Sequence, residues 1–228
     1  MVDTRLYNTI SSSDLVFSYM DKRLIIVGAG DLGREVLGWM LSSGSLSDFS
    51  KLFFIDDSVT SLNIIGHDLV WLGNVNDFYP VDGDQLVAAI ASPITRSIIV
   101  EKLLSRGCEF ISYIDPSAKF SLGSQVGQGC IILPYSLVSN DSTIGDFSII
   151  NCHASVGHDV QIGSFVSISS HVDIMGYCEI RDKVFMGSGS RVLPRKRIGE
   201  LATIGAGATA ARSVPPGRTL YAPLSMLL

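Results

Sequence analysis

The chain has 228 residues, 46% of them hydrophobic, and a formal net charge of −5 at neutral pH. This is enough apolar material for a packed core, in one large domain or two small ones, while the negative balance gives no broad attraction to nucleic acid or to anionic lipid. No apolar stretch approaches the roughly 20 residues of a membrane span and no basic flank precedes an apolar run, so we expect a cytoplasmic protein that binds neither nucleic acid nor membrane.

The first half of the chain predicts a small α/β domain. Residues 1–21 are mostly polar, apart from a short apolar run near 15–20, and form an N-terminal extension to which we assign no function. Residues 22–113 alternate apolar strands with helical segments, a pattern that indicates a parallel sheet. We expect strands at 23–27, 52–55, 86–90 and 110–114, one helix at 34–42, and another of about a dozen residues after Pro93.

A glycine-rich turn follows the first predicted strand. Gly28, Gly30 and Gly33 form a GxGxxG pattern between strand and helix, where the backbone can approach a phosphate. Asp56 ends the second strand, where an acidic side chain can accept a ribose hydroxyl. The predicted sheet is about half of a full dinucleotide-binding domain, so a mononucleotide-sized ligand fits better. Packing of helix on strand is the alternative explanation for these glycines.

A hexapeptide repeat dominates the second half of the chain. From Ile114 to Ala210 every sixth residue is apolar, and a second column four residues later holds small or β-branched side chains, broken only by Lys196. A period of six fits neither a helix nor a hairpin sheet and predicts a parallel β-helix with eighteen residues per three-sided coil. We assign residues 114–214 to this β-helix. Residues 215–228 begin with Pro-Pro-Gly and are expected to stop the coil and cover its last turn.

His158 and Asp159, in the middle of the repeat, suggest a general base. Gly176 follows His158 by eighteen residues, so the two should lie side by side on neighbouring coils. An imidazole, a carboxylate and a nearby backbone N–H supply the base and the oxyanion donor that acyl transfer needs. Asp159 reaches His158 only if a corner redirects it, because successive strand residues point to opposite faces. An exposed histidine without a catalytic role is the alternative.

Other polar residues of the repeat carry weaker signals. His153 and His171 are also eighteen residues apart and should stack on a different face, in a structural, subunit-interface or ligand-binding role. We expect no metal, because two histidines without a carboxylate at fixed spacing are a weak signal and the four cysteines lack CxxC spacing. Arg195 and Arg212 belong to a basic cluster near the C-terminal coils that suits the phosphates of coenzyme A, or else a solvated rim.

Taken together, these motifs resemble the hexapeptide-repeat acyltransferases with a left-handed β-helix. Within them, the chain is similar to the two-domain nucleotide-sugar N-acetyltransferases of the bacillosamine and perosamine type, which are close to sialic-acid O-acetyltransferases. The resemblance covers residues 22–217 and is carried by the glycine-rich turn, Ile55-Asp-Asp57, Asn151, His158-Asp-Val-Gln-Ile-Gly163, Ile204-Gly-Ala-Gly207 and Val214-Pro-Pro-Gly217. The family often has a histidine where this chain has Asp31-Leu32.

The resemblance implies a Rossmann-like domain followed by a left-handed β-helix, in a homotrimer with active sites between subunits. His158 would deprotonate a sugar amine that attacks acetyl-CoA, Asp159 would tune this base, and Gly176 would hold the acetyl carbonyl. The residues expected to contact the nucleotide sugar are Gly28, Gly30, Asp31, Leu32, Asp56, Asp57 and Asn151. Those expected at acetyl-CoA are Gly176, Gly205 and Ala206, in addition to Arg195 and Arg212 from the basic cluster.

The sequence therefore predicts an acetyl-CoA-dependent N-acetyltransferase that acts on a nucleotide-linked amino sugar. We expect a 4-amino-4,6-dideoxyhexose destined for a surface polysaccharide, acetylated directly from acetyl-CoA. A sugar O-acetyltransferase remains open, because His158 would activate a hydroxyl equally well. A non-catalytic scaffold that binds a nucleotide sugar is a further alternative. An NAD-dependent oxidoreductase is disfavoured by the small domain, and a β-helix carbonic anhydrase would need three converging histidines.

Overall fold

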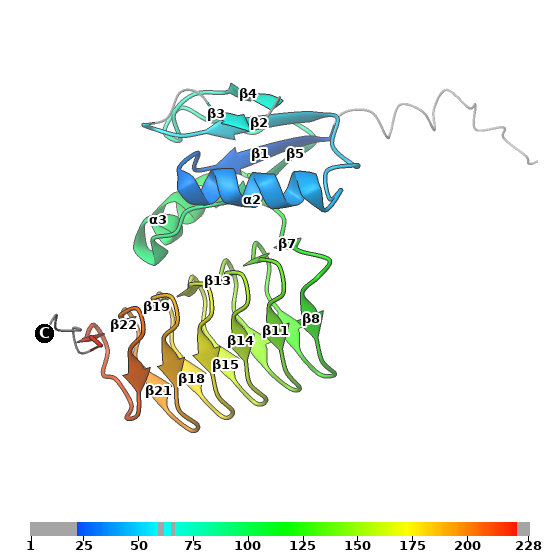
Figure 1. Cartoon of the computed structure of the whole chain (residues 1–228). Helices are drawn as coiled ribbons and strands as arrows, with labels where there is room; N and C mark the ends of the chain where they lie inside the picture. The colour runs from blue at the N-terminus through cyan, green and yellow to red at the C-terminus, as the bar shows by residue number, and fades with distance from the viewer. Residues whose placement is uncertain (1–21, 59–61, 65–66, 223–228) are drawn as a thin grey trace, which may run out of the picture.

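In the computed structural model, residues 22–58, 62–64 and 67–222 are described (Figure 1). A six-stranded sheet with two helices comes first, and a parallel β-solenoid follows. The expectations for residues 1–21, and for the end of the tail at 223–228, lie outside the described residues. Within the described residues, no helix combines the length and the apolar character that crossing a membrane would require.

The N-terminal part is built around a sheet with the strand order β3-β4-β2-β1-β5-β6. All pairs are parallel except β3 with β4. The strands are β1 (Arg23–Val27), β2 (Lys51–Ile55), β3 (Leu62–Ile64), β4 (His67–Trp71), β5 (Asp84–Ala88) and β6 (Glu109–Phe110), and the helices are α2 (Asp31–Ser42) and α3 (Pro93–Leu104). Residues 24–27 are fully buried, as expected for a parallel strand covered on both faces.

Several predicted elements are confirmed and others need correction. The first strand and both helices are present, although α2 begins at Asp31 and the third predicted strand lies at 84–88. The β3–β4 hairpin was not predicted. The single strand expected at 110–114 is wrong: β6 ends the N-terminal sheet at Phe110, whereas β7 (Tyr113–Ile114) pairs within the solenoid. The short gap between them hides this change of sheet in the sequence.

The solenoid has three sheets, one for each side of the coil. Sheet 1 contains β7, β10 (Ile131–Ile132), β13 (Ile149–Ile150), β16 (Ser167–Ile168), β19 (Phe185–Met186), β22 (Thr203–Ile204) and β24 (Thr219–Leu220). Sheet 2 contains β8 (Lys119–Phe120), β11 (Leu137–Val138), β14 (Ser155–Val156), β17 (Asp173–Ile174), β20 (Arg191–Val192) and β23 (Thr209–Ala210). Sheet 3 contains β9 (Gln125–Val126), β12 (Thr143–Ile144), β15 (Gln161–Ile162), β18 (Glu179–Ile180) and β21 (Arg197–Ile198).

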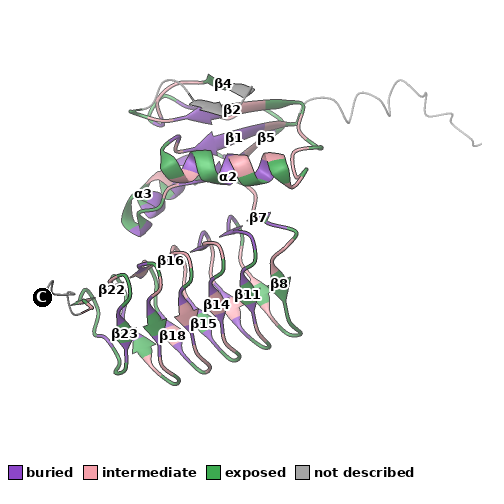
Figure 2. Cartoon of the chain, viewed as in Figure 1, coloured by how far each residue is buried: buried purple, intermediate pink, exposed green. Residues whose placement is uncertain are grey.

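The predicted eighteen-residue stacking is confirmed by strand register. Val138 pairs with Val156, and Ile150 pairs with Ile168. The second residue of each strand points inward, and this column is buried from Ile132 to Ala210, so that buried residues recur on coil after coil in Figure 2. The coils therefore stack through one continuous apolar core, as in other solenoids.

The C-terminal end of the coil differs from the prediction. Val214-Pro-Pro-Gly217 was expected to stop the coil, yet β24 follows it and pairs with β22. Ile204 pairs with Leu220, and Ile198 bridges to Val214, so these contacts span sixteen residues instead of eighteen. A two-residue shortening therefore keeps Val214 and Leu220 against the core, and the six-residue phase ends without ending the coil.

Left-handed backbone turns the chain at the corners of each coil. We call the turns between sheets 1 and 2 the 1–2 corner, and those between sheets 2 and 3 the 2–3 corner. His153 and His171 on the 1–2 corner, and Asp159 and Tyr177 on the 2–3 corner, have φ values of 58° to 60°. The N–H of each such residue donates to the coil before it, as Tyr177 N does to the His158 carbonyl over 3.0 Å. These bonds offset the conformational cost of a left-handed residue with a side chain.

The N-terminal part rests on sheet 1 (Figure 1). Tyr113, Ile131 and Ile149, which point outward from sheet 1, share an apolar cluster with Leu24 and Val36. This contact covers one side of the solenoid. The 2–3 corner lies away from that covered side.

Arg96 joins the two parts from the first turn of α3. Its fully buried guanidinium donates to the carbonyls of Phe147 and Val166, at 2.8 and 3.1 Å, and to Ser167 Oγ at 3.0 Å. It also donates to the Ile90 carbonyl, which follows β5. Burial lowers the pKa of Arg96 to about 9, so this side chain remains a cation at neutral pH.

Candidate active site

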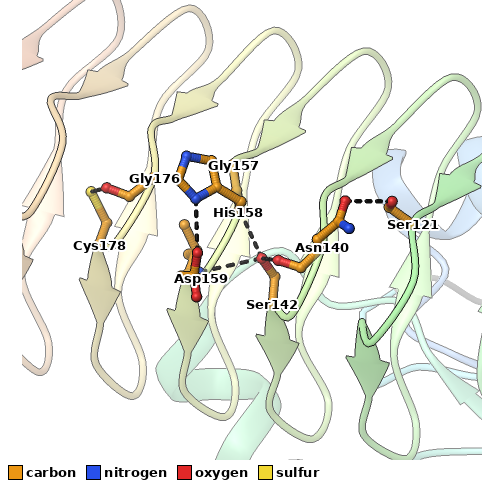
Figure 3. Close-up of polar contacts among 9 residues, drawn as sticks. Ser121, Asn140, Ser142, Gly157, His158, Asp159, Gly176 and Cys178 are labelled. Carbon is orange, nitrogen blue, oxygen red and sulfur yellow. Dashed lines mark hydrogen bonds and ion pairs between the residues drawn. The ribbon is translucent and has the colours of Figure 1, made fainter.

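His158 and Asp159 form a hydrogen-bonded pair on the 2–3 corner, directly after β14 (Figure 3). The left-handed backbone of Asp159, with φ of 58°, turns its carboxylate back, and Oδ2 lies 2.8 Å from His158 Nδ1. The corner thus provides the redirection that the sequence required. An ionised carboxylate only accepts hydrogen bonds, so Nδ1 of a neutral ring donates and Nε2 keeps its lone pair. The pair presents a basic nitrogen at Nε2.

Gly176 lies against this nitrogen from the next coil. A Cβ atom added at Gly176 would be 2.7 Å from His158 Nε2 and 2.8 Å from its Cε1, so any other residue there would displace the ring. The Gly176 carbonyl accepts from Arg195 N, whereas none of the described residues accepts from its N–H. With the His158 side chain 56% exposed, Nε2 can take a proton from an attacking group, while the Gly176 N–H is available to a carbonyl oxygen.

Tyr177 and Arg195 extend the same corner. The Tyr177 and His158 rings form a T-shaped pair with 5.0 Å between centroids, and the Arg195 guanidinium lies 4.4 Å from the Tyr177 ring centroid. Arg195 was expected at coenzyme phosphates, and here it lies one coil beyond Gly176. Sequence reasoning missed Tyr177, although it follows Asp159 by the eighteen residues of one coil.

Polar groups of the preceding coils hold the backbone of the corner in place (Figure 3). Ser142 Oγ donates to the Gly157 carbonyl over 2.6 Å, just before the base. The Asn140 carbonyl accepts from Asp159 N over 3.0 Å, and its Oδ1 accepts from Ser121 over 2.6 Å. Because Ser142 is fully buried, its hydroxyl fixes the backbone of the corner without contact with solvent. This serine of the second column therefore serves as an internal donor.

The glycine-rich turn lies at the carboxyl end of β1. Gly28 has φ of 95°, and a Cβ atom at Gly33 would lie 2.0 Å from the Gly28 carbonyl oxygen, so these two positions need glycine for local packing. A Cβ atom at Gly30 would meet nothing within 4 Å, so the turn is open beside it. Asp31 and Leu32 then begin α2, whose N-cap, Gly30, offers no side-chain acceptor.

Asp56 and Asp57 connect this turn with the next strands. Asp56 Oδ2 accepts from Ala29 N over 2.8 Å, inside the turn, and its Oδ1 accepts from Ser58 N over 2.7 Å. Asp57 Oδ1 accepts from Val75 N over 2.8 Å. Both carboxylates therefore stabilise the loops at the carboxyl end of the sheet, in addition to any contact with a ligand.

Asn151, His153 and His171 lie on the 1–2 corner, apart from His158. Asn151 Oδ1 accepts from Cys152 N at 2.6 Å and from Ser170 Oγ at 3.0 Å. The His153 and His171 rings stack with 5.0 Å between centroids, which confirms the predicted pairing, and Tyr135 stacks on His153. Among the described residues no group of three or more His, Cys, Asp or Glu is placed to hold a metal ion.

Cys152 connects this corner to the N-terminal part. It packs against the apolar cluster that includes α2. Burial, with the charge of Glu35 on α2 as a further cause, raises the pKa of its thiol. Asn151 is therefore close to the domain contact.

The remaining predicted residues lie near the C-terminal coils. Gly205 and Ala206 follow β22 on the 1–2 corner. Arg212 follows β23 and lines a cavity of about 410 Å³ together with Arg218. Within one chain, the predicted site residues thus form separate groups. They lie on two corners of the solenoid, at its last coils, and at the carboxyl end of the N-terminal sheet.

Known proteins resemble this chain in sequence and in structure. No family model matches the chain. The chain is 32% identical over 170 residues to GDP-perosamine N-acetyltransferase of Escherichia coli O157:H7, a match that spans 72% of this chain and 75% of that protein. The structure of the present chain resembles the acetyltransferase domain of PglB from Neisseria gonorrhoeae in complex with acetyl coenzyme A. The TM-score is 0.76 at 25% identity, and the match covers 87% of this chain and 95% of that one. It also resembles WeeI from Acinetobacter baumannii, with a TM-score of 0.77, 26% identity and coverage of 86% and 94%.

Proposed function

Because the chain belongs to the family of hexapeptide-repeat nucleotide-sugar N-acetyltransferases, we propose that it transfers the acetyl group of acetyl-CoA to the amino group of a nucleotide-linked sugar. The observation that carries this proposal is the 2–3 corner. A base oriented by a carboxylate lies there beside Gly176, whose N–H donates to no acceptor among the described residues. The acceptor we propose is a 4-amino-4,6-dideoxyhexose destined for a surface polysaccharide.

His158 acts as the general base in this proposal. As the sugar amine attacks the thioester carbonyl, a C–N bond forms and Nε2 takes the proton from nitrogen. The carbonyl oxygen becomes an oxyanion that the Gly176 N–H stabilises. When the C–S bond breaks, the imidazolium returns the proton to the leaving sulfur. Proton transfer of this kind contributes about 10²- to 10⁴-fold to rate.

Asp159 acts through His158 in the same scheme. Its hydrogen bond to Nδ1 keeps the lone pair at Nε2 and stabilises the charge that the ring gains in the transition state. The cationic Arg195 stacks on Tyr177, which packs against the His158 ring, and in this proposal it would pair with the phosphates of acetyl-CoA.

For the coenzyme, we propose a path along the C-terminal coils. Gly205 and Ala206 would line it on the 1–2 corner, and Arg212 would pair with phosphates from the cavity that it shares with Arg218. The relative PglB was solved with acetyl coenzyme A, which supports a coenzyme on this fold.

For the nucleotide, we propose that the N-terminal part is a Rossmann-like domain. Gly28 and Gly30 would approach the diphosphate beside Asp31 and Leu32, where the turn is open. Asp56 and Asp57 would accept ribose hydroxyls, and Asn151 would contact the sugar.

A second copy of the chain completes the site in this proposal. The N-terminal part covers sheet 1, while His158 lies on the corner opposite to that sheet. A homotrimer with sites between subunits would bring one protomer's nucleotide sugar to its neighbour's base. Acetyl-CoA and nucleotide sugars are cytoplasmic metabolites, so the proposal includes a cytoplasmic location.

The test is thiol release from acetyl-CoA with UDP-, dTDP- and GDP-linked 4-amino-4,6-dideoxysugars. We expect release with one carrier, and a loss of about 100-fold or more in kcat in His158→Ala. Asp141→Asn, at an exposed position of the same corner one coil before Asp159, is the control and should retain activity.

A loss below tenfold in folded His158→Ala would contradict the role of the base. Release with hydroxyl sugars but with none of the amino sugars would instead favour the O-acetyltransferase. No release with either, together with nucleotide-sugar binding, would favour the non-catalytic scaffold.

A further inference from the structure

We infer that the indole of Trp71 is the platform on which the nucleobase of the sugar nucleotide stacks. This inference rests on the proposed function and adds a residue to it that sequence reasoning did not single out. Its basis is the place of Trp71 in the sheet, the face on which it lies, its exposure and its hydrogen bond.

Trp71 ends β4 beside the carboxyl end of β2. In the parallel pair formed by these strands, Trp71 is opposite Phe54, one residue before β2 ends at Ile55. Its indole Nε1–H donates to the Asp56 carbonyl over 3.2 Å. Open α/β sheets bind ligands beyond the carboxyl ends of their strands. We place the ribose at Asp56, after β2, and β4 is the next strand on the side of β2 away from β1. The indole is therefore held where a base would follow the ribose.

The side chain lies on the same face as the glycine-rich turn. Phe54, its partner across the pair, and Leu69, two residues earlier on β4, both belong to the apolar cluster under α2. The next residue, Leu72, points to the other face of the sheet, where it packs in the cluster that contains Leu103 of α3. Because side chains alternate along a strand, Trp71 faces the α2 side, where the turn enters the helix.

One residue connects the platform with the turn. Asp56 accepts from Trp71 through its carbonyl and from Ala29 N through its carboxylate, at 3.2 and 2.8 Å. Asp56 thus contacts both the indole and the turn beside which we place the diphosphate. This is the order of groups in a nucleotide, with phosphate, ribose and base in succession.

The exposure of Trp71 suits a stacking surface. The side chain is 38% exposed, whereas its neighbour Phe54 is completely buried. Its hydrogen bond limits the orientations of the ring, so a base would find a preformed surface at little entropic cost. Stacking of a base on an aromatic ring contributes about 1–3 kcal/mol, which corresponds to about 5- to 150-fold in affinity.

The chain offers a direct optical test, because its only tryptophans are Trp39 and Trp71. Trp39 lies in the second half of α2, away from the turn, and is similarly exposed at 36%. We would titrate Trp39→Phe and Trp71→Phe with GDP, UDP and dTDP, follow tryptophan fluorescence, and measure Kd independently by calorimetry. We expect quenching in Trp39→Phe and none in Trp71→Phe. Trp71→Ala should weaken binding about 5- to 150-fold.

Kinetics provides a second readout. In Trp71→Ala the KM for the nucleotide sugar should rise by the same factor, with kcat and the KM for acetyl-CoA unchanged. The more conservative Trp71→Phe retains a ring that fills the site, so it keeps the test valid if the alanine variant folds poorly.

Nucleotide binding without quenching in Trp39→Phe, or with unchanged affinity in Trp71→Ala, would overturn the inference and leave the proposed function standing. Absence of nucleotide binding to every variant and to the unsubstituted protein would overturn both.

Discussion

The 2–3 corner of the solenoid and the carboxyl end of the N-terminal sheet hold the two halves of the proposed site, and they position their residues in different ways. On the 2–3 corner, eighteen-residue stacking places Gly176 against His158 because both follow the same repeat. At the carboxyl end of the sheet, Trp71 and Ala29 both donate hydrogen bonds to Asp56, although Trp71 ends β4 and Ala29 follows β1. The periodic region positions residues through sequence spacing, whereas the sheet positions them through strand order. Their tolerance of mutation should differ accordingly.

The largest expected difference concerns deletions. Removing Ser169 from the solenoid shifts every later inward residue by one position, which moves apolar side chains out of the core. We expect loss of cooperative folding, measured by circular dichroism during thermal unfolding. Removing Ser47, in the exposed turn after α2, should leave a cooperative transition. A stable and active Ser169 deletion would contradict the coil assignment.

The contact that joins the two regions should come next. Arg96→Met leaves buried carbonyls of Phe147 and Val166 without their donor, so we expect the free energy of unfolding to fall by about 3 kcal/mol. Arg96→Lys should recover part of this loss. The measurement is denaturant unfolding, with the exposed Arg34→Met as a control that changes stability by less than about 0.5 kcal/mol. Equal effects at the two arginines would show that the joint contributes little.

The same arginine predicts a pH dependence. Burial lowers the pKa of Arg96 to about 9, well below the ordinary value for an arginine. Between these values the unfolded chain binds more protons than the folded one, so this group makes stability rise with pH. Below about pH 8 both states are protonated, and the difference between the unsubstituted protein and Arg96→Met should be constant. A difference that already changes between pH 6 and 8 would show that another group titrates with it.

Within the corner, Gly176→Ala tests the space beside the base. The added methyl group would meet His158 Nε2 at 2.7 Å and displace the ring, so we expect kcat to fall about 100-fold in the thiol-release assay. Gly38→Ala is the matched control, because a Cβ atom there meets nothing within 4 Å in the middle of α2. It should keep full activity and gain up to about 1 kcal/mol in stability. Full activity in Gly176→Ala would contradict the proposed oxyanion position.

The smallest predicted effect is that of the carboxylate. Asp159→Asn keeps the shape of the side chain and tolerates the left-handed backbone, but removes the charge, so we expect kcat to fall about tenfold. Asp141→Asn, at the same corner position one coil earlier with φ of 57°, should leave kcat unchanged. If both variants lose activity equally, the effect would come from the corner backbone and not from His158.

The candidate site was predictable to different extents in the two regions. The pairing of His158 with Gly176, and the stack of His153 on His171, follow from arithmetic on the repeat. Arg96 carried no signal, because its acceptors in the solenoid lie more than 50 residues away and two of them are backbone carbonyls. The position of Trp71 was not predictable either, because the β3–β4 hairpin that brings it beside β2 was not predicted.

The sequence by itself determined the register of the solenoid and the pairing at its corners, because a fixed period of six makes sequence distance equal to position in space. It also indicated the glycine-rich turn, because that motif is local. Only the tertiary structure decided that β6 and β7 belong to different sheets, that the coil continues to Leu220, and that sheet 1 carries the N-terminal part. These outcomes depend on burial and hydrogen bonds between segments far apart in the chain, for which no repeat supplies the distance.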